Sequence, residues 1–269
     1  MSKIELDKYY TSPELAKYVV DKTKEIIGED NITEYIEPSA GAGVFLDYLD
    51  KPYLAYDIEP EDDRIIKQDF LELDIEYKKG RCIIGNPPYG VGNTQSVQFY
   101  KKSITISDSI SFIQPISQLN NNMQMYEFNL IHSEDLGLQT YTDRELHCCF
   151  NIYVRPAGGI LGSKPNYKLK DVVLKQSRKR NGVVPGNIDI KDYDIAVCIR
   201  GNGSAGKVCN SLNDYNDIIL VKCINEDLRD EVIESMKNIR SFFKSSISSL
   251  NINTWQVYKY LKEQIPELK

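Results

Sequence analysis

Hydrophobic and polar residues alternate along the first part of the chain in two rhythms, one helical and one extended. Residues 12–27 repeat apolar side chains at helical spacing, and Ser12, Pro13 and Glu14 supply the cap, the first-turn proline and the first-turn acid of a helix start. Short runs rich in β-branched and aromatic residues predict strands at residues 32–37, 53–60, 64–70, 81–89, 109–117 and 147–156. Further helices are predicted at residues 44–50, 94–104 and 121–131.

Strands that alternate with helices over residues 30–155 indicate an α/β fold, in which a mostly parallel sheet carries helices on both faces. The pattern changes after Pro156, because residues 157–187 are rich in Gly, Pro and basic residues and show no clear period. Strands are then predicted at residues 194–201 and 217–224, and helices at 226–246 and 253–265. We therefore expect two domains, residues 1–156 and a smaller α+β region at residues 157–269.

The distribution of charge changes the picture of what the protein contacts. The whole chain of 269 residues carries a net charge of −6, which taken alone argues against a nucleic-acid partner. Residues 1–90, however, carry a net charge of −9, whereas residues 151–210 carry +7. An acidic half beside a basic middle suits an enzyme that contacts a polyanion locally.

Composition also limits where the protein is expected to occur and whether it is expected to bind a metal. No segment has the apolar length needed to cross a membrane, and the N-terminus lacks the apolar core of a secretory signal. The six cysteines form no C-x-x-C pair, and the two histidines offer no metal-ligand spacing. We expect a cytoplasmic protein with reduced thiols, without membrane contact and without a metal site.

Small and acidic residues follow the ends of the first three predicted strands. Gly41 and Gly43 in "EPSAGAGVF" let a ligand approach the backbone at a helix start, although the third glycine of the dinucleotide fingerprint is absent. Asp57 ends the next strand, where an acid can bind ribose hydroxyls. Asp69 and Phe70 follow the third, where they could accept from an exocyclic amine and stack on a purine. Each also fits a plain turn, a surface acid or a core aromatic, but open α/β sheets bind ligands at this edge.

The fourth strand stops abruptly at Asn86, Pro87, Pro88 and Tyr89. Two prolines cannot donate to a sheet ladder, and Pro87 excludes the helical conformation at Asn86. A stiff turn would explain the prolines alone. The same four residues also present an amide, bare carbonyls and an aromatic ring beyond the end of a strand.

In residues 9–155 these motifs occur in an order that resembles the S-adenosylmethionine-dependent N6-adenine DNA methyltransferases. "YYTSPELAKYVV" is similar to the family's leading cofactor motif, "EPSAGAGVF" to its glycine motif, "YDIEP" to its ribose-binding acid, "QDF" to its adenine-contacting pair and "GNPPYG" to its catalytic motif. The resemblance implies a Rossmann-like methyltransferase fold with target recognition in the C-terminal region. It also implies S-adenosylmethionine as cofactor, bound by Thr11, Pro13, Glu37, Ala40, Gly41, Gly43, Asp57, Ile58, Asp69, Phe70 and Asn86.

The resemblance assigns the chemistry to the Asn-Pro-Pro-Tyr motif. The lone pair of an adenine amine is delocalised into the ring, so two acceptors aimed at its N–H bonds would favour the pyramidal transition state. The Asn86 side-chain oxygen and the Pro87 carbonyl can be those acceptors, with Pro88 holding the turn rigid and Tyr89 offering a face for stacking. Tyr141 is the best match to a second aromatic that packs on the extruded base, with Phe150 as the alternative.

Four other readings compete with this assignment. Protein glutamine methyltransferases share the motif but usually lack the leading "TSPELA" segment and a basic C-terminal extension. Enzymes for adenine in structured RNA usually lack the second proline, and cytosine-N4 enzymes more often have Ser in place of Asn86. An inactivated fold used only for binding is disfavoured because every motif position is filled.

The basic segment after Pro156 is the candidate contact with double-stranded DNA. We expect Lys175, Arg178, Lys179 and Arg180 to bind DNA, whereas the alternative is a solvated loop. The glycine-rich residues 200–207 lack the Walker spacing and predict a loop that could approach a phosphate backbone. The recognition region is small, so a short site or a homodimer is compatible with it, and a cognate restriction nuclease is left open as a further partner.

Overall fold

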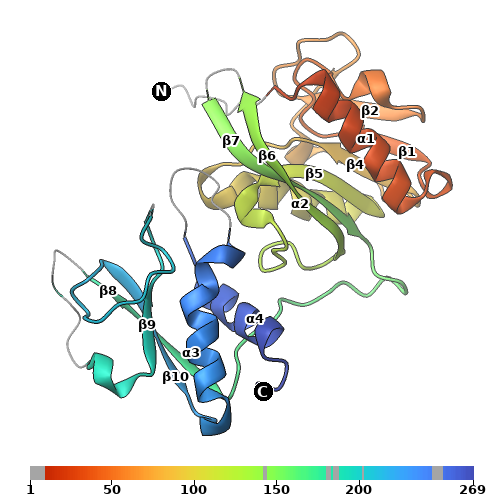
Figure 1. Ribbon diagram of the computed structural model, residues 1–269. Coiled ribbons are helices and arrows are strands. Elements are labelled where there is room, and N and C mark those ends of the chain that lie inside the picture. The colour runs from red at the N-terminus through yellow and green to blue at the C-terminus, as the bar shows by residue number, and fades with distance from the viewer. Residues whose placement is uncertain (1–9, 142–143, 180–182, 184–187, 202, 244–250) are drawn as a thin grey trace. The chain divides into compact units, whose positions relative to one another are not determined.

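The computed structural model describes residues 10–141, 144–179, 183, 188–201, 203–243 and 251–269 (Figure 1). The chain divides into two compact units, residues 1–165 and 166–269. This division falls somewhat later than Pro156, where the composition changes. No helix in these ranges combines the length and apolarity that crossing a membrane requires.

The first unit is built on a seven-stranded sheet in the order β3-β2-β1-β4-β5-β7-β6. The strands are β1 (Glu34–Glu37), β2 (Tyr53–Asp57), β3 (Ile66–Lys67), β4 (Arg81–Gly85), β5 (Ser109–Pro115), β6 (Asn129–Tyr141) and β7 (Arg144–Val154). All pairs are parallel except those that β7 makes with β5 and β6. The order of the first five strands is that of doubly wound nucleotide-binding sheets, which bind ligands where the order reverses, here between β1 and β4.

Helices cover both faces of this sheet, which confirms the expected fold class (Figure 1). Helix α1 (Pro13–Ile27) is capped by Ser12, whose side chain accepts from the backbone of Leu15 as expected. Its apolar side packs in one cluster with Tyr35, and helix α2 (Thr94–Ile106) packs in another with Ile36. Because neighbouring strand residues point to opposite faces, the two helices lie on opposite sides of β1.

Three predicted elements differ from the structure. Residues 44–50 form only a 3-10 turn at Leu46–Tyr48, and residues 64–70 contribute the two-residue strand β3. The helix predicted at 121–131 is wrong, because the chain there is irregular and then enters β6. Asparagine is the cause: Asn120 is left-handed (φ 50°), and the side chain of Asn121 accepts from the backbone of Met123 at 3.0 Å. Such local bonds compete with helical ones.

The second unit is a three-stranded antiparallel sheet in the order β8-β10-β9 with two helices. Its elements are β8 (Val172–Arg178), β9 (Ile195–Cys198), β10 (Asp217–Cys223), α3 (Arg229–Asn238) and α4 (Thr254–Gln264). Ile219 and Val221 of β10 share one apolar cluster with Val232 of α3 and Leu261 of α4. Strand β8 runs through the basic segment, so the alternative of a solvated loop is wrong for residues 172–178.

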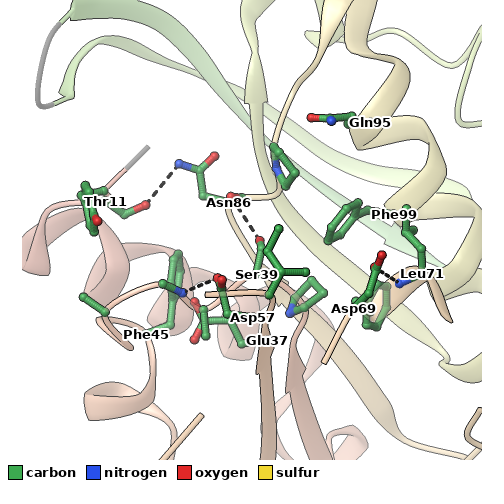
Figure 2. A pocket seen from close by; sticks show the side chains of 18 of the residues that line it. Thr11, Glu37, Ser39, Phe45, Asp57, Asp69, Leu71, Asn86, Gln95 and Phe99 are labelled. Atoms are coloured by element: carbon green, nitrogen blue, oxygen red, sulfur yellow. Dashed lines mark hydrogen bonds between the residues drawn. The ribbon is translucent and has the colours of Figure 1, made fainter. Parts of the chain in front are cut away.

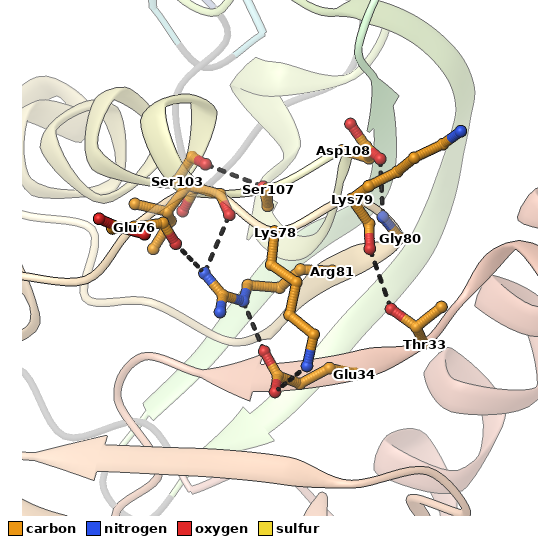
Figure 3. A network of polar contacts seen from close by, with 11 residues as sticks. Thr33, Glu34, Glu76, Lys78, Lys79, Gly80, Arg81, Ser103, Ser107 and Asp108 are labelled. Carbon is orange, nitrogen blue, oxygen red and sulfur yellow. Dashed lines mark hydrogen bonds and ion pairs between the residues drawn. The ribbon is translucent and has the colours of Figure 1, made fainter.

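A polar network ties the amino ends of β1 and β4 together, at the opposite ends of the strands from the turns described above (Figure 3). The buried guanidinium of Arg81 donates from Nε to Glu34 at 2.6 Å and from Nη1 to the backbone oxygens of Glu76 and Ile106. Lys78 donates to the other oxygen of Glu34 at 2.7 Å. The network therefore fixes the start of the two central strands whose far ends carry the candidate motifs.

Candidate active site

A cavity of about 780 Å³ lies at the carboxyl ends of β1, β2 and β4 (Figure 2). This volume is within the range of small-molecule and cofactor sites. Residues predicted from the cofactor motifs gather on its wall: Thr11, Pro13, Glu37, Ala40, Gly41, Asp57, Ile58, Asp69, Phe70 and Asn86. Gly43 is the one predicted cofactor residue that does not line it, since its amide closes the turn on the carbonyl of Ala40 at 2.7 Å.

The side chain of Asp57 orders the glycine-rich turn that follows β1. Gly41 has φ 54°, and a Cβ on it would meet nothing within 4 Å, so the backbone faces open space. The amide of Gly41 donates to Asp57 Oδ2 and that of Glu59 to Asp57 Oδ1, both at 2.8 Å. A carboxylate oxygen has more than one lone pair, so Asp57 can order this turn and still accept from ribose hydroxyls.

Glu37, the last residue of β1, is the most unusual acid of the site. Its side chain is buried, and Oε2 has no hydrogen-bond partner among the residues that the structure describes. Burial, followed by the nearby charge of Asp57, raises the pKa of Glu37 well above its usual value, while Arg64 opposes the shift. A buried acceptor without a partner is costly, so a cationic group bound in the cavity would stabilise it.

Asn86 follows β4 and uses both ends of its amide. Nδ2 donates to the Thr11 hydroxyl at 3.3 Å (Figure 2). Oδ1 accepts from the Tyr89 hydroxyl at 2.9 Å. Thr11 comes from the segment before α1, so the leading motif and the Asn-Pro-Pro-Tyr motif meet directly at this amide. Pro88 lines the cavity, and its carbonyl accepts from Ser96 at 3.1 Å, whereas Pro87 is buried away from the wall.

Tyr89 and Tyr141 lie in the core and not on the cavity wall. Their hydroxyls lie 3.6 Å and 3.4 Å from the sulfur of Cys148. Burial raises the pKa of both tyrosines, so the hydroxyls stay protonated at neutral pH. Phe150, the alternative aromatic, is fully buried in the same cluster. The stacking of an extruded base on these rings therefore stays a prediction, and it requires at least one ring to become exposed.

The remaining end of the cavity is lined by aromatic side chains, and it includes residues of α2 that the sequence analysis did not predict. Asp69 caps a 3-10 turn through the amide of Leu71 at 2.8 Å, and Phe70 stacks on Phe99 with ring centroids 5.5 Å apart. Phe99 belongs to α2, which also contributes Gln95 to the wall (Figure 2). The signal for these α2 residues was the helical spacing directly after the Asn-Pro-Pro-Tyr turn, which points residues 95, 98 and 99 to one side.

The predicted DNA-contacting residues belong to the second unit. Lys175 is exposed on β8, Arg178 is paired with Asp217, and Lys179 donates to the backbone oxygen of Asn213 at 2.8 Å. Arg180 lies outside the described residues. Their contact with DNA stays a prediction.

Comparison with known proteins gives a distant likeness of fold. No protein-family model matches the sequence, and no curated protein matches it. A proposed RNA methyltransferase of Pyrococcus horikoshii, PH1948, is 15% identical over 57% of this chain and 89% of its own, with a TM-score of 0.46. The 23S rRNA methyltransferase ErmE is 13% identical over 56% of this chain and 70% of its own, with a TM-score of 0.41.

A third solved structure is the magnesium protoporphyrin IX methyltransferase of Synechocystis with bound S-adenosylmethionine. It is 11% identical over 52% of this chain and 79% of its own, with a TM-score of 0.37. Such values do not carry a functional assignment, so the function must be inferred from the site itself.

Proposed function

We propose that this protein transfers a methyl group from S-adenosylmethionine to the N6 amine of an adenine extruded from DNA. The observation that carries the proposal is the position of Asn86. Its amide lies at the end of β4, between a rigid proline turn and the cavity that the cofactor motifs line. An acceptor for an amine and a pocket for a nucleoside cofactor thus adjoin each other.

The residues of the cavity fit the cofactor. The unpartnered oxygen of Glu37 suits the α-ammonium group of its methionyl part, and the open face of Gly41 admits a close approach to the backbone. Asp57 would hold the ribose hydroxyls, and the Phe70–Phe99 pair would cover the adenine. When bound, the cofactor supplies a sulfonium methyl that needs alignment and no further activation.

Asn86 and the proline turn act on the acceptor amine. Oδ1 of Asn86 already accepts from Tyr89, and its second lone pair can accept one N–H of the target amine. The Pro87 carbonyl would accept the other once the turn exposes it, because Pro87 lies buried away from the cavity wall. Together they hold the amine pyramidal, so its lone pair points at the methyl carbon. As the nitrogen–carbon bond formed, the sulfur–methyl bond of the cofactor would break and leave a neutral thioether. The amine would lose its proton to water, without a histidine base.

DNA is the proposed substrate because the motif series resembles the DNA family and because the second unit concentrates positive charge. Residues 151–210 carry +7 in a chain that is acidic elsewhere. Phosphate contacts of such a region would position the duplex, while the base is extruded into the first unit.

The test is mass spectrometry of nucleosides and peptides after incubation with isotopically labelled S-adenosylmethionine and DNA, RNA or a protein mixture. The proposal expects labelled N6-methyladenine in DNA from the wild type and none from Asn86→Ala. Label found only in RNA, in cytosine or in glutamine would assign one of the competing activities. Cofactor binding without any transfer to these substrates would make the protein a binder.

A further inference from the structure

The second unit contains a buried carboxylate that holds two arginines from different segments. Asp217 opens β10, and its register partner on β8 is Arg178. The backbone amide of Ile199 donates to the Asp217 carbonyl, which brings the next residue, Arg200, to the same place. Arg200 belongs to the glycine-rich segment 200–207, which the proposed function leaves without a role.

Both arginines contact Asp217 through Nε. Arg178 Nε donates to Asp217 Oδ2 at 2.9 Å, and Arg200 Nε lies 2.7 Å from the same oxygen. Gln176 donates to the second oxygen at 2.7 Å. The Asp217 side chain is only 5% exposed, whereas those of Arg178 and Arg200 are 53% and 46% exposed. Within the part of the chain that the structure describes, neither guanidinium has another acceptor.

Arg178 makes a hydrogen bond and Arg200 an ion pair, and in the described part of the chain no hydrogen bond involves a terminal nitrogen of either guanidinium. The buried carboxylate of Asp217 thus holds two planar guanidinium groups near each other. Two positive charges are balanced by only one negative charge. Fork-shaped N–H groups match paired acceptors, above all the oxygens of a phosphate. Fixing the side chains in advance lowers the entropy that binding would otherwise lose.

Another arginine of the same unit provides a contrast. Arg229 is 49% exposed and is also paired with a buried aspartate, Asp194. Arg229 uses a terminal nitrogen, Nη2, for this contact, so part of its fork is turned inward. Arg229 therefore resembles Arg178 and Arg200 in exposure and in its pairing with a buried aspartate. It differs in the guanidinium nitrogen that makes this contact.

We infer that Arg178 and Arg200, positioned by Asp217, form a binding site for a phosphodiester group of the DNA backbone. The inference rests on the proposed function for the identity of the polyanion. The excess of positive charge over residues 151–210 favours a phosphate over a neutral acceptor. Asp217 is a positioning residue here and does not touch the DNA.

The test measures binding of a fluorescent duplex by anisotropy across a salt series, with the full-length protein. Arg178→Lys and Arg200→Lys keep the net charge and lose the fork, so affinity should fall roughly 10-fold or more. Arg200→Ala should in addition flatten the slope of log K against log salt by about 0.9. Arg229→Lys is the matched control and should bind like the wild type.

Asp217→Asn separates positioning from charge. The substitution removes one buried negative charge and so raises the net charge by one. Charge alone therefore predicts tighter binding to DNA, whereas loss of the anchor predicts weaker binding. Thermal melting and cofactor affinity show whether the variant is folded. If it is not, the two Arg→Lys variants, whose side chains are half exposed, carry the test.

The outcomes also separate this inference from the proposed function. A wild type that binds the cofactor but no DNA contradicts the proposed function. A wild type that binds DNA, together with Arg→Lys variants that bind like Arg229→Lys, overturns the phosphate site alone. Loss of preference for a guanine at one position, with an unchanged salt slope in Arg200→Ala, assigns the pair to a base edge and also overturns it.

Discussion

Tyr89 gains a role that its position in the motif did not suggest. Its ring is buried, and its hydroxyl donates to Oδ1 of Asn86, the oxygen proposed to accept the target amine. The hydroxyl therefore fixes the orientation of the amide, with Thr11 holding the other end. A residue expected to stack on the substrate thus also positions the acceptor.

Tyr89→Phe tests this positioning. The variant keeps the ring and loses one hydrogen bond worth about 1 kcal/mol, so we expect kcat for methyl transfer to fall roughly 5- to 10-fold. The dissociation constant for S-adenosylmethionine should not change, because Tyr89 does not line the cavity. Single-turnover kinetics and calorimetry measure the two quantities. An unchanged kcat would contradict the proposed role of the Tyr89 hydroxyl in positioning Asn86.

Glu37 links cofactor binding to pH. Its pKa is raised in the folded protein by burial, so the associated stability is present at low pH and is lost as pH rises through that pKa. Glu37→Gln should therefore raise the melting temperature of the cofactor-free protein, by more at pH 8 than at pH 5. Cofactor affinity should fall roughly 10- to 100-fold with the loss of a charged partner.

Calorimetric melting at the two pH values and titration with S-adenosylmethionine measure these effects. A melting temperature that does not depend on the substitution at either pH would contradict the raised pKa of Glu37 in the folded protein.

At the scale of elements, the sequence was sufficient where one local signal determined the outcome. Ser12 and Pro13 marked the start of α1, and strand ends placed Gly41, Asp57 and Asn86 on one edge of the sheet. Because parallel strands share an edge, the cofactor motifs could be brought together without a structure.

The sequence was insufficient where side chains make distant or local polar bonds. Asparagine bonds replaced the helix expected before β6, and pairing with β10 made a strand of the basic segment. The contact of Tyr89 with Asn86 depends on how the turn folds back, and that of Arg200 with Asp217 depends on strand register. No spacing along the chain encodes either contact.

The network at the amino ends of β1 and β4 yields a prediction about stability (Figure 3). Although burial raises the pKa of Glu34, the bonds from Lys78 and Arg81 outweigh it and lower that pKa overall. The stabilisation is thus present above the unfolded pKa and is lost as pH falls through the folded one. Glu34→Gln leaves the buried Arg81 without its charge partner and should cost about 3–5 kcal/mol at pH 7.

Urea unfolding at pH 7 and at pH 3 measures the difference, which should shrink at the lower pH. Glu25→Gln is the matched control. Glu25 pairs with Lys22 on the surface of α1 and is 67% exposed, so its loss should change stability by less than about 0.5 kcal/mol. Equal effects of the two substitutions would contradict the structural role of the network.

At the scale of the whole molecule, the candidate cofactor cavity and the arginine pair belong to different units. Every described residue that lines the cavity lies between Tyr10 and Phe99, and the arginine pair lies in the second unit. Among the residues that the structure describes, the apolar clusters of the first unit contain none after Val154, and those of the second contain none before Tyr167. Each unit therefore has a hydrophobic core of its own, as independently folding domains do.

A fragment of residues 1–165 should consequently fold and bind S-adenosylmethionine with the affinity of the full chain, because no wall of the cavity is removed. Its affinity for duplex DNA should fall steeply, since the basic residues that would neutralise phosphates are absent. Calorimetric titration with the cofactor and anisotropy with labelled DNA test the two halves of this expectation. Full DNA affinity in the fragment would place the polyanion contact in the first unit, and loss of cofactor binding in a folded fragment would show that the second unit completes the cavity.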